Sequence, residues 1–404
     1  MSNDGLMNLL SLIRMKLPRA LAITVFAFVL SSLLLKPLSF SASAFLSNPE
    51  KSDFAITDVY TILADSREVR DRDRNIMIVN LRGLDREGIA QVLELMPLLE
   101  PRAVGLDVVF LEPREDDSRL LSAVRSCPRL VLAESVRAQE GRFVKYERSF
   151  FADSIGGEAR SGVTTFPARF AKSTIRDFRG YFPLAEGGES PSFAAALAEA
   201  GAPEAARALK ERGKELELIN YASRDIEVIM PEEIAERADD LRGKIILLGD
   251  TDDLLDMHAT PLNSTLSGVR VHAAALATIL DGAYLDKMGD TGNKALAFGM
   301  CLLILLIWHM FSDKEVLLRG GTVRILQLLM LVTMVVTGYV LFVDERYVWD
   351  FSYTLLMITF GLFANDIWLF GEYIAVVLPR KIRGRRVGRR GLTQEDGVET
   401  SNMK

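Results

Sequence analysis

The stretch that decides the fold is residues 243–285, which read GKIILLGDTDDLLDMHATPLNSTLSGVRVHAAALATILDGAYL. Its apolar run at 244–248 lies between two glycines and is rich in Ile and Leu, which is typical of a strand buried on both faces of a sheet. An acidic loop follows, and Gly268 begins a helical pattern that continues through Leu280 and ends at Gly282. This order places the polar loop at the carboxyl end of the strand, where open α/β sheets bind ligands.

The segments before this stretch alternate between strand and helix patterns. Residues 75–81 and 103–110 are apolar runs typical of strands, and between them residues 86–99 carry apolar side chains at helical spacing. A short helix at 118–124 and a strand at 130–133 continue the alternation. This βαβαβ order predicts parallel strands with helices packed on both faces of the sheet.

The middle of the chain is harder to assign. Residues 137–190 are rich in Gly, Arg and Ser, and helices are expected at 192–200 and 232–238. Two more strands are expected at 215–221 and 225–230, and the short connection between them would allow a hairpin. The expected fold class is an α/β extracytoplasmic domain with a mixed, largely parallel sheet, joined to a four-helix α transmembrane region.

The transmembrane region is predicted from four apolar segments, at 20–35, 295–311, 325–343 and 351–370, the last of which can continue to Leu378. The loop at 312–324 is basic, the loop at 344–350 is mostly acidic, and the tail is strongly basic. By the positive-inside rule both ends are cytoplasmic and the large domain is exported to the periplasm. The expected parts are a cytoplasmic amino terminus and membrane anchor (1–36), a periplasmic domain (37–290), three transmembrane helices (291–378) and a basic cytoplasmic tail (379–404).

The first apolar segment has a second interpretation. Residues 42–44, Ala-Ser-Ala, resemble a signal-peptide cleavage site, whereas Lys36 and Pro37 interrupt the approach to it. We favour an uncleaved anchor, and either interpretation exports the domain that follows.

Composition limits the class of protein. With 404 residues, 49% of them hydrophobic and 25% charged, the chain is too polar for a transporter with many spans and long enough for one sizeable soluble core. The cysteines at 127 and 301 lie in different regions, so no disulfide is expected, and the three histidines show no metal-binding spacing. No cofactor is expected. The basic tail beside a membrane helix favours anionic membrane lipids as its partner over nucleic acid.

Two motifs resemble a known family. The first is the GK–apolar strand–G of the opening stretch, followed by an Asp, a Thr-Pro pair at 260–261, a Gly-Val step at 268–269 and a His-Ala pair at 272–273. The second is AVGLDVVFLEPREDD at 103–117. Both are similar to the CHASE sensor domain of the second type, an extracytoplasmic module found in front of bacterial cyclases, histidine kinases and protein kinases. The resemblance covers roughly residues 40–288.

The candidate ligand-binding residues follow from strand ends and from this resemblance. Asp107 lies near the end of one expected strand and Asp256 follows another, so parallel pairing would direct both carboxylates into one crevice. The resemblance also indicates Thr260 and Arg176, and His258 lies beside Asp256. The alternative is that these polar side chains cap loops and hold the fold through hydrogen bonds to backbone N–H groups.

Other polar residues near the opening stretch favour structural roles. Asp250, Asp252 and Asp253 lack the spacing of an EF-hand calcium loop and are expected to form a solvated acidic turn. His272 is expected to cap or pack at the start of its helix.

Asp366, with Asn365 beside it, is the unusual feature of the last apolar segment. A carboxylate inside a membrane is costly and usually faces a partner helix or water, so these two residues are candidates for coupling to a partner. The alternative is an interfacial position beside Trp368 and Tyr373.

The expected function is that of a bacterial inner-membrane sensor rather than an enzyme. Its periplasmic domain would perceive an unknown ligand, and its helices would relay the signal to a separate effector, because no cyclase or kinase domain follows the last helix. Self-association is a further expected interaction. The alternatives are an accessory subunit of a membrane complex that binds no ligand, and a periplasmic hydrolase that uses Asp107 and Asp256.

Overall fold

The computed structural model describes residues 3–46, 56–65, 72–152, 160–167, 173–222, 225–262, 265–311 and 316–379. The chain divides into two compact units. The α/β unit comprises residues 44–287 and 339–349, and the helical unit comprises residues 1–43, 288–338 and 350–404.

The α/β unit is built on a seven-stranded sheet in the described part of the chain. The strands follow the order β10-β1-β11-β2-β3-β4, with β5 also pairing with β3, and only the β3–β4 pair is antiparallel. This confirms the prediction of a mixed, largely parallel sheet. The strands are β1 (Ile76–Asn80), β2 (Ala103–Leu106), β3 (Leu130–Gln139), β4 (Arg142–Arg148), β5 (Arg160–Val163), β10 (Val228–Ile229) and β11 (Ile245–Gly249).

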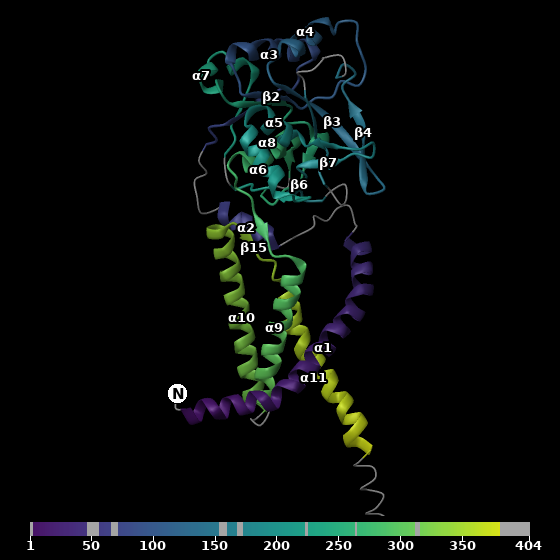
Figure 1. The fold of residues 1–404 in the computed structure, drawn as a ribbon, viewed down its shortest axis with the longest axis vertical. Helices are drawn as coiled ribbons and strands as arrows, with labels where there is room; N and C mark the ends of the chain where they lie inside the picture. Colours follow the sequence, from purple (N-terminus) through teal and green to yellow (C-terminus); the bar gives the residue numbers. More distant parts are fainter. Residues whose placement is uncertain are drawn as a thin grey trace, which may run out of the picture. The chain divides into compact units, whose positions relative to one another are not determined.

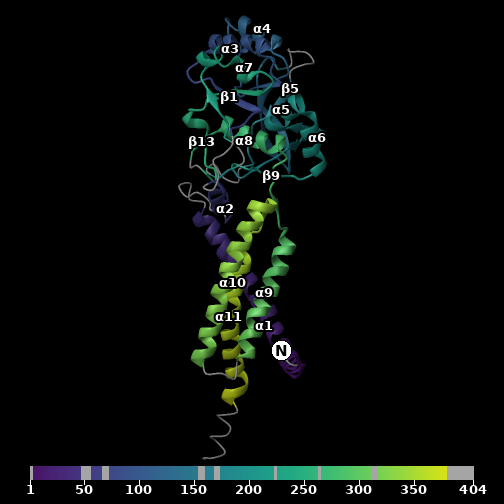
Figure 2. The same cartoon turned by 90° about the vertical axis from the view of Figure 1, so that its left-hand side faces the viewer.

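Helices cover both faces of this sheet, as Figure 1 and Figure 2 show. Met77 and Val79 of β1 pack toward one group of helices, whereas Ile76 and Ile78 pack toward the other. The first group is α3 (Arg86–Leu99), α4 (Ser118–Ser126) and α7 (Ala238–Leu241), and the second is α5 (Phe193–Gly201), α6 (Pro203–Arg212) and α8 (Gly268–Leu280). Burial on both faces explains why the central strands are continuously apolar rather than alternating.

The helix of small residues, α5, lies unusually close to the sheet. Ser192 caps its start by accepting the Ala195 N–H at 3.2 Å. A side chain in place of Gly162 on β5 would place its Cβ 2.6 Å from the Cα of Phe193, so only glycine permits this approach. The alanine-rich sequence of α5 is therefore explained by close packing on the strands.

Short ribbons complete the α/β unit, and the structure departs from the sequence prediction at two places. The two segments expected to form a hairpin belong to different sheets, because β9 (Glu217–Leu218) pairs with β6 (Asp177–Phe178) and β10 pairs with β1. The expected helix at 232–238 is instead a 3₁₀ turn, η1 (Pro231–Glu233), followed by α7, because Glu233 accepts the Met230 N–H and closes a tight turn. The other ribbons pair β7 (Tyr181–Pro183) with β8 (Glu189–Pro191), β12 (Met257–His258) with β13 (Leu266–Ser267), and β14 (Asp286–Lys287) with β15 (Tyr347–Val348).

The helical unit contains most of α1 (Asn3–Leu46), with α9 (Asp290–Met310), much of α10 (Val316–Glu345) and α11 (Ser352–Glu372), which continues into a π-helical turn, η3 (Tyr373–Val377). Each of the four α-helices carries a segment long and apolar enough to cross a membrane, which confirms the predicted four helices. Gly361 of α11 permits close packing on α9, because a Cβ there would lie 2.6 Å from the Cys301 sulfur.

Candidate ligand-binding crevice

A crevice with a cavity volume of about 410 Å³ opens beside the carboxyl ends of β2 and β11. Asp107 follows the last residue of β2, and Asp250 follows the last residue of β11. Because β2 and β11 are parallel neighbours, their following loops meet at the same edge of the sheet. The ionisable side chains that line the crevice are Asp107, Asp250, Asp253, Asp256, His258 and His272. Asp107 and Asp256 thus line the same crevice, as parallel pairing of the strands predicts.

Asp256 connects the crevice with the start of α8 through a hydrogen bond. Its Oδ2 accepts the N–H of Gly268, the first residue of the helix, at 3.1 Å, and its Oδ1 lies 3.0 Å from His258 Nε2. A Cβ on Gly268 would lie 2.3 Å from Asp256 Oδ2, so the carboxylate occupies the space that a side chain would need. A negative charge at a helix start also interacts favourably with the helix dipole. Asp256 thus performs the capping role that the structural alternative assigned to it.

Asp107 performs no such role. Its backbone N–H donates to the Leu248 carbonyl at 2.8 Å, but in the described part of the chain its carboxylate has no hydrogen-bond partner. Burial, and secondarily the neighbouring charge of Asp256, raise the pKa of Asp107 to about 7. A desolvated carboxyl group that faces a cavity without a partner is costly, and such groups concentrate at functional sites.

His272 lies one turn into α8 and is only 5% exposed. Its ring stacks on Phe166 with centroids 4.4 Å apart, and it makes an edge contact with Phe193. Burial lowers the pKa of His272 to about 3, so the ring is neutral. No hydrogen bond to its ring nitrogens exists among the described residues. The expected packing role is therefore correct, but the ring also presents unused nitrogen atoms at the crevice.

The acidic loop after β11 is organised by its own hydrogen bonds. Asp250 Oδ1 accepts the Asp252 N–H at 2.7 Å, and Asp253 Oδ1 accepts the Leu255 N–H at 2.9 Å. Asn80, at the end of β1, donates to Asp252 Oδ2 at 2.9 Å. These contacts form the turn expected from the sequence. Among the described residues no three His, Cys, Asp or Glu side chains are placed to hold a metal ion.

Two of the predicted site residues do not line the crevice. Thr260 is buried, and Arg176 forms a two-pronged ion pair with Asp58 of α2 (Ile56–Asp65), with both nitrogen–oxygen distances at 2.7 Å. Ile175 lines the crevice instead, because neighbouring side chains of an extended segment point in opposite directions. The structure also adds Phe166, which lies in a segment whose sequence showed no periodic pattern.

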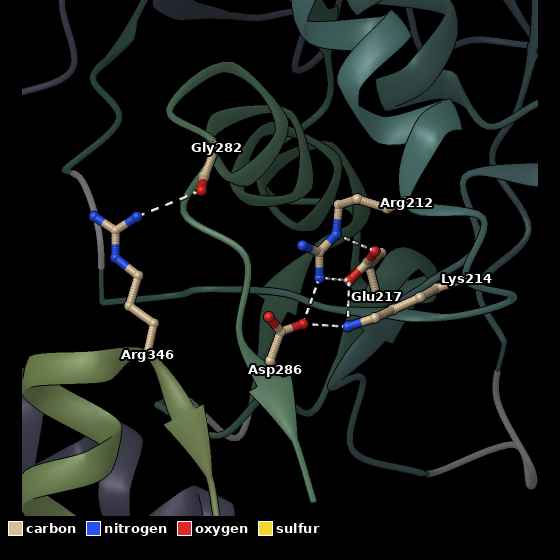
Figure 3. Close-up of polar contacts among 6 residues, drawn as sticks. All are labelled: Arg212, Lys214, Glu217, Gly282, Asp286 and Arg346. Carbon is tan, nitrogen blue, oxygen red and sulfur yellow. Dashed lines mark hydrogen bonds and ion pairs between the residues drawn. The ribbon is translucent and has the colours of Figure 1, made fainter. Parts of the chain in front are cut away.

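A second polar cluster follows the carboxyl end of α8 within the α/β unit (Figure 3). Arg212 donates from Nε to the buried Glu217 and from a terminal nitrogen to Asp286, each at 2.6 Å, and Lys214 also pairs with Asp286. The backbone N–H of Asp286 donates to the Arg346 carbonyl at 2.9 Å, and the Arg346 side chain reaches the Gly282 carbonyl at 3.4 Å. These contacts surround the β14–β15 pair, which we call the strap.

The chain combines a largely parallel α/β sheet, a polar crevice at its strand ends and, among the described residues, four helices apolar enough to cross a membrane. The chain belongs to the CHASE2 domain family, whose model matches residues 21–312. The CHASE2 domain is a sensor-type extracytoplasmic domain. Comparison with curated proteins and with solved structures finds no match to the chain.

Replacing Gly268 by alanine tests the junction between Asp256 and α8. Because the new Cβ would displace the Asp256 carboxylate, Gly268→Ala should lower the free energy of unfolding by about 1 kcal/mol, as loss of a helix cap does. In an Asp256→Ala background the same substitution should cost much less, since the clash is gone. Chemical unfolding of the four proteins in this cycle measures the coupling, and additive effects would contradict the described contact.

The pH dependence of stability tests Asp107 and His272, the two polar side chains of the crevice that have no hydrogen-bond partner among the described residues. The folded protein holds a proton on Asp107 between about pH 4 and pH 7, so this group's contribution to stability falls as pH rises. His272 stays neutral in the folded protein between about pH 3 and pH 6.5, so its contribution rises with pH. Each slope has an upper limit of about 1.4 kcal/mol per pH unit, and in wild type the two oppose each other.

The variants Asp107→Asn and His272→Phe should separate these slopes. From pH 4.5 to 6.5, relative to wild type, Asp107→Asn should gain stability as pH rises and His272→Phe should lose it. Chemical unfolding at several pH values measures both trends, and three parallel curves would show that neither group titrates as described.

Proposed function

We propose that the protein is a signal sensor of the bacterial inner membrane. Its α/β unit, on the periplasmic side, binds a stimulus in the crevice, and its membrane helices relay that event to a separate effector protein. The orientation is supported by the basic residues of segment 312–324 and of the tail, against the mostly acidic segment 344–350.

The observation that carries this proposal is the position of α8 between the crevice and the strap. Its first residue, Gly268, is held by Asp256, and His272 lines the crevice. Just beyond its last residue, Gly282 accepts the hydrogen bond from Arg346, and β14 follows. A helix of 13 residues is about 20 Å long and stiff, so a displacement at its start is transmitted to its end.

The strap leads directly into the membrane helices along the chain. β14 ends at Lys287 and α9 begins at Asp290, whereas β15 lies between the end of α10 at Glu345 and the start of α11 at Ser352. One ribbon therefore joins segments that continue into three helices. Its neighbour Arg346 has a φ of 52°, a left-handed conformation that is unfavourable for residues other than glycine and that surrounding contacts must maintain.

A second connection runs from the crevice through α2. Ile175 lines the crevice, and the next residue, Arg176, holds Asp58 of α2. From the same helix, Tyr60 packs its ring on Phe342 near the end of α10, with centroids 5.7 Å apart. In this proposal Arg176 serves to connect the crevice wall with α2 rather than to touch the ligand.

Hydrogen exchange tests the relay through α8 without knowledge of the ligand. Asp256→Ala releases the start of α8, so we expect amide exchange in segments 282–287 and 346–349 to accelerate roughly threefold to tenfold through local opening. The measurement is hydrogen exchange with mass spectrometry on the full chain in detergent. Ile246→Val is the matched control, because it costs a comparable free energy, about 1 kcal/mol, on the opposite face of the sheet. Changes confined to residues 250–272 would contradict the relay.

The helical unit offers a place for the effector. A groove of about 540 Å³ between α10 and α11 is lined by Asp366, Arg324, Gln327 and otherwise mainly apolar side chains. Among the described residues Asp366 forms no ion pair, and its only side-chain hydrogen bond comes from Asn365 at 3.4 Å. An intramembrane carboxylate of this kind requires a polar partner, so we assign the groove to an effector helix that carries a basic or amide side chain.

Cross-linking from the groove tests this assignment. A photoreactive residue at Phe363, which lines the groove, should cross-link a membrane partner in wild type, and Asp366→Leu should reduce the yield about threefold, the effect of losing a typical polar contact between membrane helices. Ile367→Leu, on the adjacent residue, should leave the yield unchanged at equal expression. Equal yields in all three proteins would remove the coupling role of Asp366. A product that contains only a second copy of this chain would replace the effector by self-association.

A further inference from the structure

The hydrogen-bonding groups left free in the crevice indicate what it binds. The hydroxyl groups of Thr164 and Thr165 already donate to the carbonyls of Glu134 and Val136, so they can only accept further hydrogen bonds. The ionised carboxylate of Asp107 accepts only, and the neutral ring of His272 has one accepting nitrogen and one N–H donor. Acceptors therefore outnumber this single donor, and a ligand that satisfies them must supply donors of its own.

The charge of the crevice also favours a ligand that donates hydrogen bonds and carries positive charge. Four carboxylates line it, from Asp107, Asp250, Asp253 and Asp256, and no lysine or arginine is among the described lining residues. Asp256 is neutralised in part by the start of α8, but Asp107 has no partner. An anion would meet repulsion from these groups, whereas a cation would relieve the cost of the half-buried Asp107 charge.

The cavity suits an organic cation better than a metal ion. No three His, Cys, Asp or Glu side chains among the described residues are placed as metal ligands, and about 410 Å³ is many times the volume of one water molecule, roughly 30 Å³. Phe166 and Ile175 provide an aromatic ring and an aliphatic side chain in the same wall. An aromatic ring attracts a cation and packs against its hydrocarbon part.

We propose that the crevice binds a small organic cation whose ammonium group donates hydrogen bonds to Asp107 and to the accepting nitrogen of His272, while its hydrocarbon part packs on Phe166 and Ile175. This assignment rests on the proposed sensor function for its biological role, but binding itself can be measured separately.

Binding of such a cation should depend on pH. The ionisable groups that face Asp107 across the crevice are Asp250, Asp253, Asp256, His258 and His272. Asp107 must be ionised to bind the cation, and its pKa is raised to about 7 by burial and by Asp256. The ionised fraction, and with it the affinity, should therefore fall about tenfold between pH 8 and pH 6.

The experiment compares three probes of equal chain length and different charge. Isothermal titration calorimetry on the full chain in detergent, with EDTA present, uses 1,4-diaminobutane as the cation, 1,4-butanediol as the neutral analogue and succinate as the anion. We expect saturable binding of the diamine alone, with affinity about tenfold lower at pH 6 than at pH 8. Asp107→Asn should lower the affinity at least tenfold and remove the pH dependence, and His272→Phe should weaken binding while keeping the stack on Phe166.

The matched control is Asp239→Asn, which makes the same chemical change at a fully exposed side chain outside the crevice. It should leave diamine binding unchanged. Lack of diamine binding, equal binding of the diol, preference for succinate, or binding that survives Asp107→Asn would each overturn the proposal. Hydrogen exchange at the strap with and without the diamine separates the two hypotheses: binding without a change at the strap contradicts the relay and leaves the cation site standing.

Discussion

The arrangement of the α/β unit depends on the insertion of β11 between β1 and β2. All five residues of β11 are buried, and the strand pairs in parallel with β1 from Ile245 to Gly249 and with β2 from Ile245 to Leu248. Since this strand comes late in the chain, it brings the acidic loop and α8 to the centre of a sheet that the earlier segments have begun. The crevice forms there because the loops after β2 and β11 must leave the sheet at the same edge. Without this pairing, Asp107 and Asp256 would have no reason to meet.

The crevice combines one polar group that stabilises the fold with two that do not. Asp256 satisfies the start of α8, so its charge has a structural use. The side chains of Asp107 and His272 have no hydrogen-bond partner among the described residues, and desolvation shifts their pKa values in opposite directions. Unsatisfied buried polar groups lower stability, and proteins retain them mainly where a function needs them. The difference in hydrogen bonding between Asp256 and Asp107 therefore distinguishes a structural carboxylate from one available to a ligand.

Local sequence patterns predicted the helices and strands whose apolar side chains follow a clear pattern. The remaining structure depends on pairing between segments that are distant in the chain. The buried runs at β1, β2 and β11, and the apolar spacing of α3, were visible because each repeats within a few residues. From strand order alone, Asp107 and Asp256 could be placed in one crevice. Arg176 could not be placed, because its orientation depends on Asp58, more than a hundred positions away in the chain. The free nitrogen atoms of His272 depend in the same way on which side chains surround it.

The strap shows how such long-range pairing constrains biosynthesis. Asp286 and Tyr347 pair across two apolar helices that separate them in sequence. Ribosomes deliver β14 well before β15, so the α/β unit remains without one of its strands until the loop between α10 and α11 has been synthesised. Nonlocal contacts of this kind form late because closing the intervening chain is entropically costly. Completion of the folded domain is thereby coupled to synthesis of α9 and α10, and a chain truncated before residue 347 would expose an unpaired β14 edge.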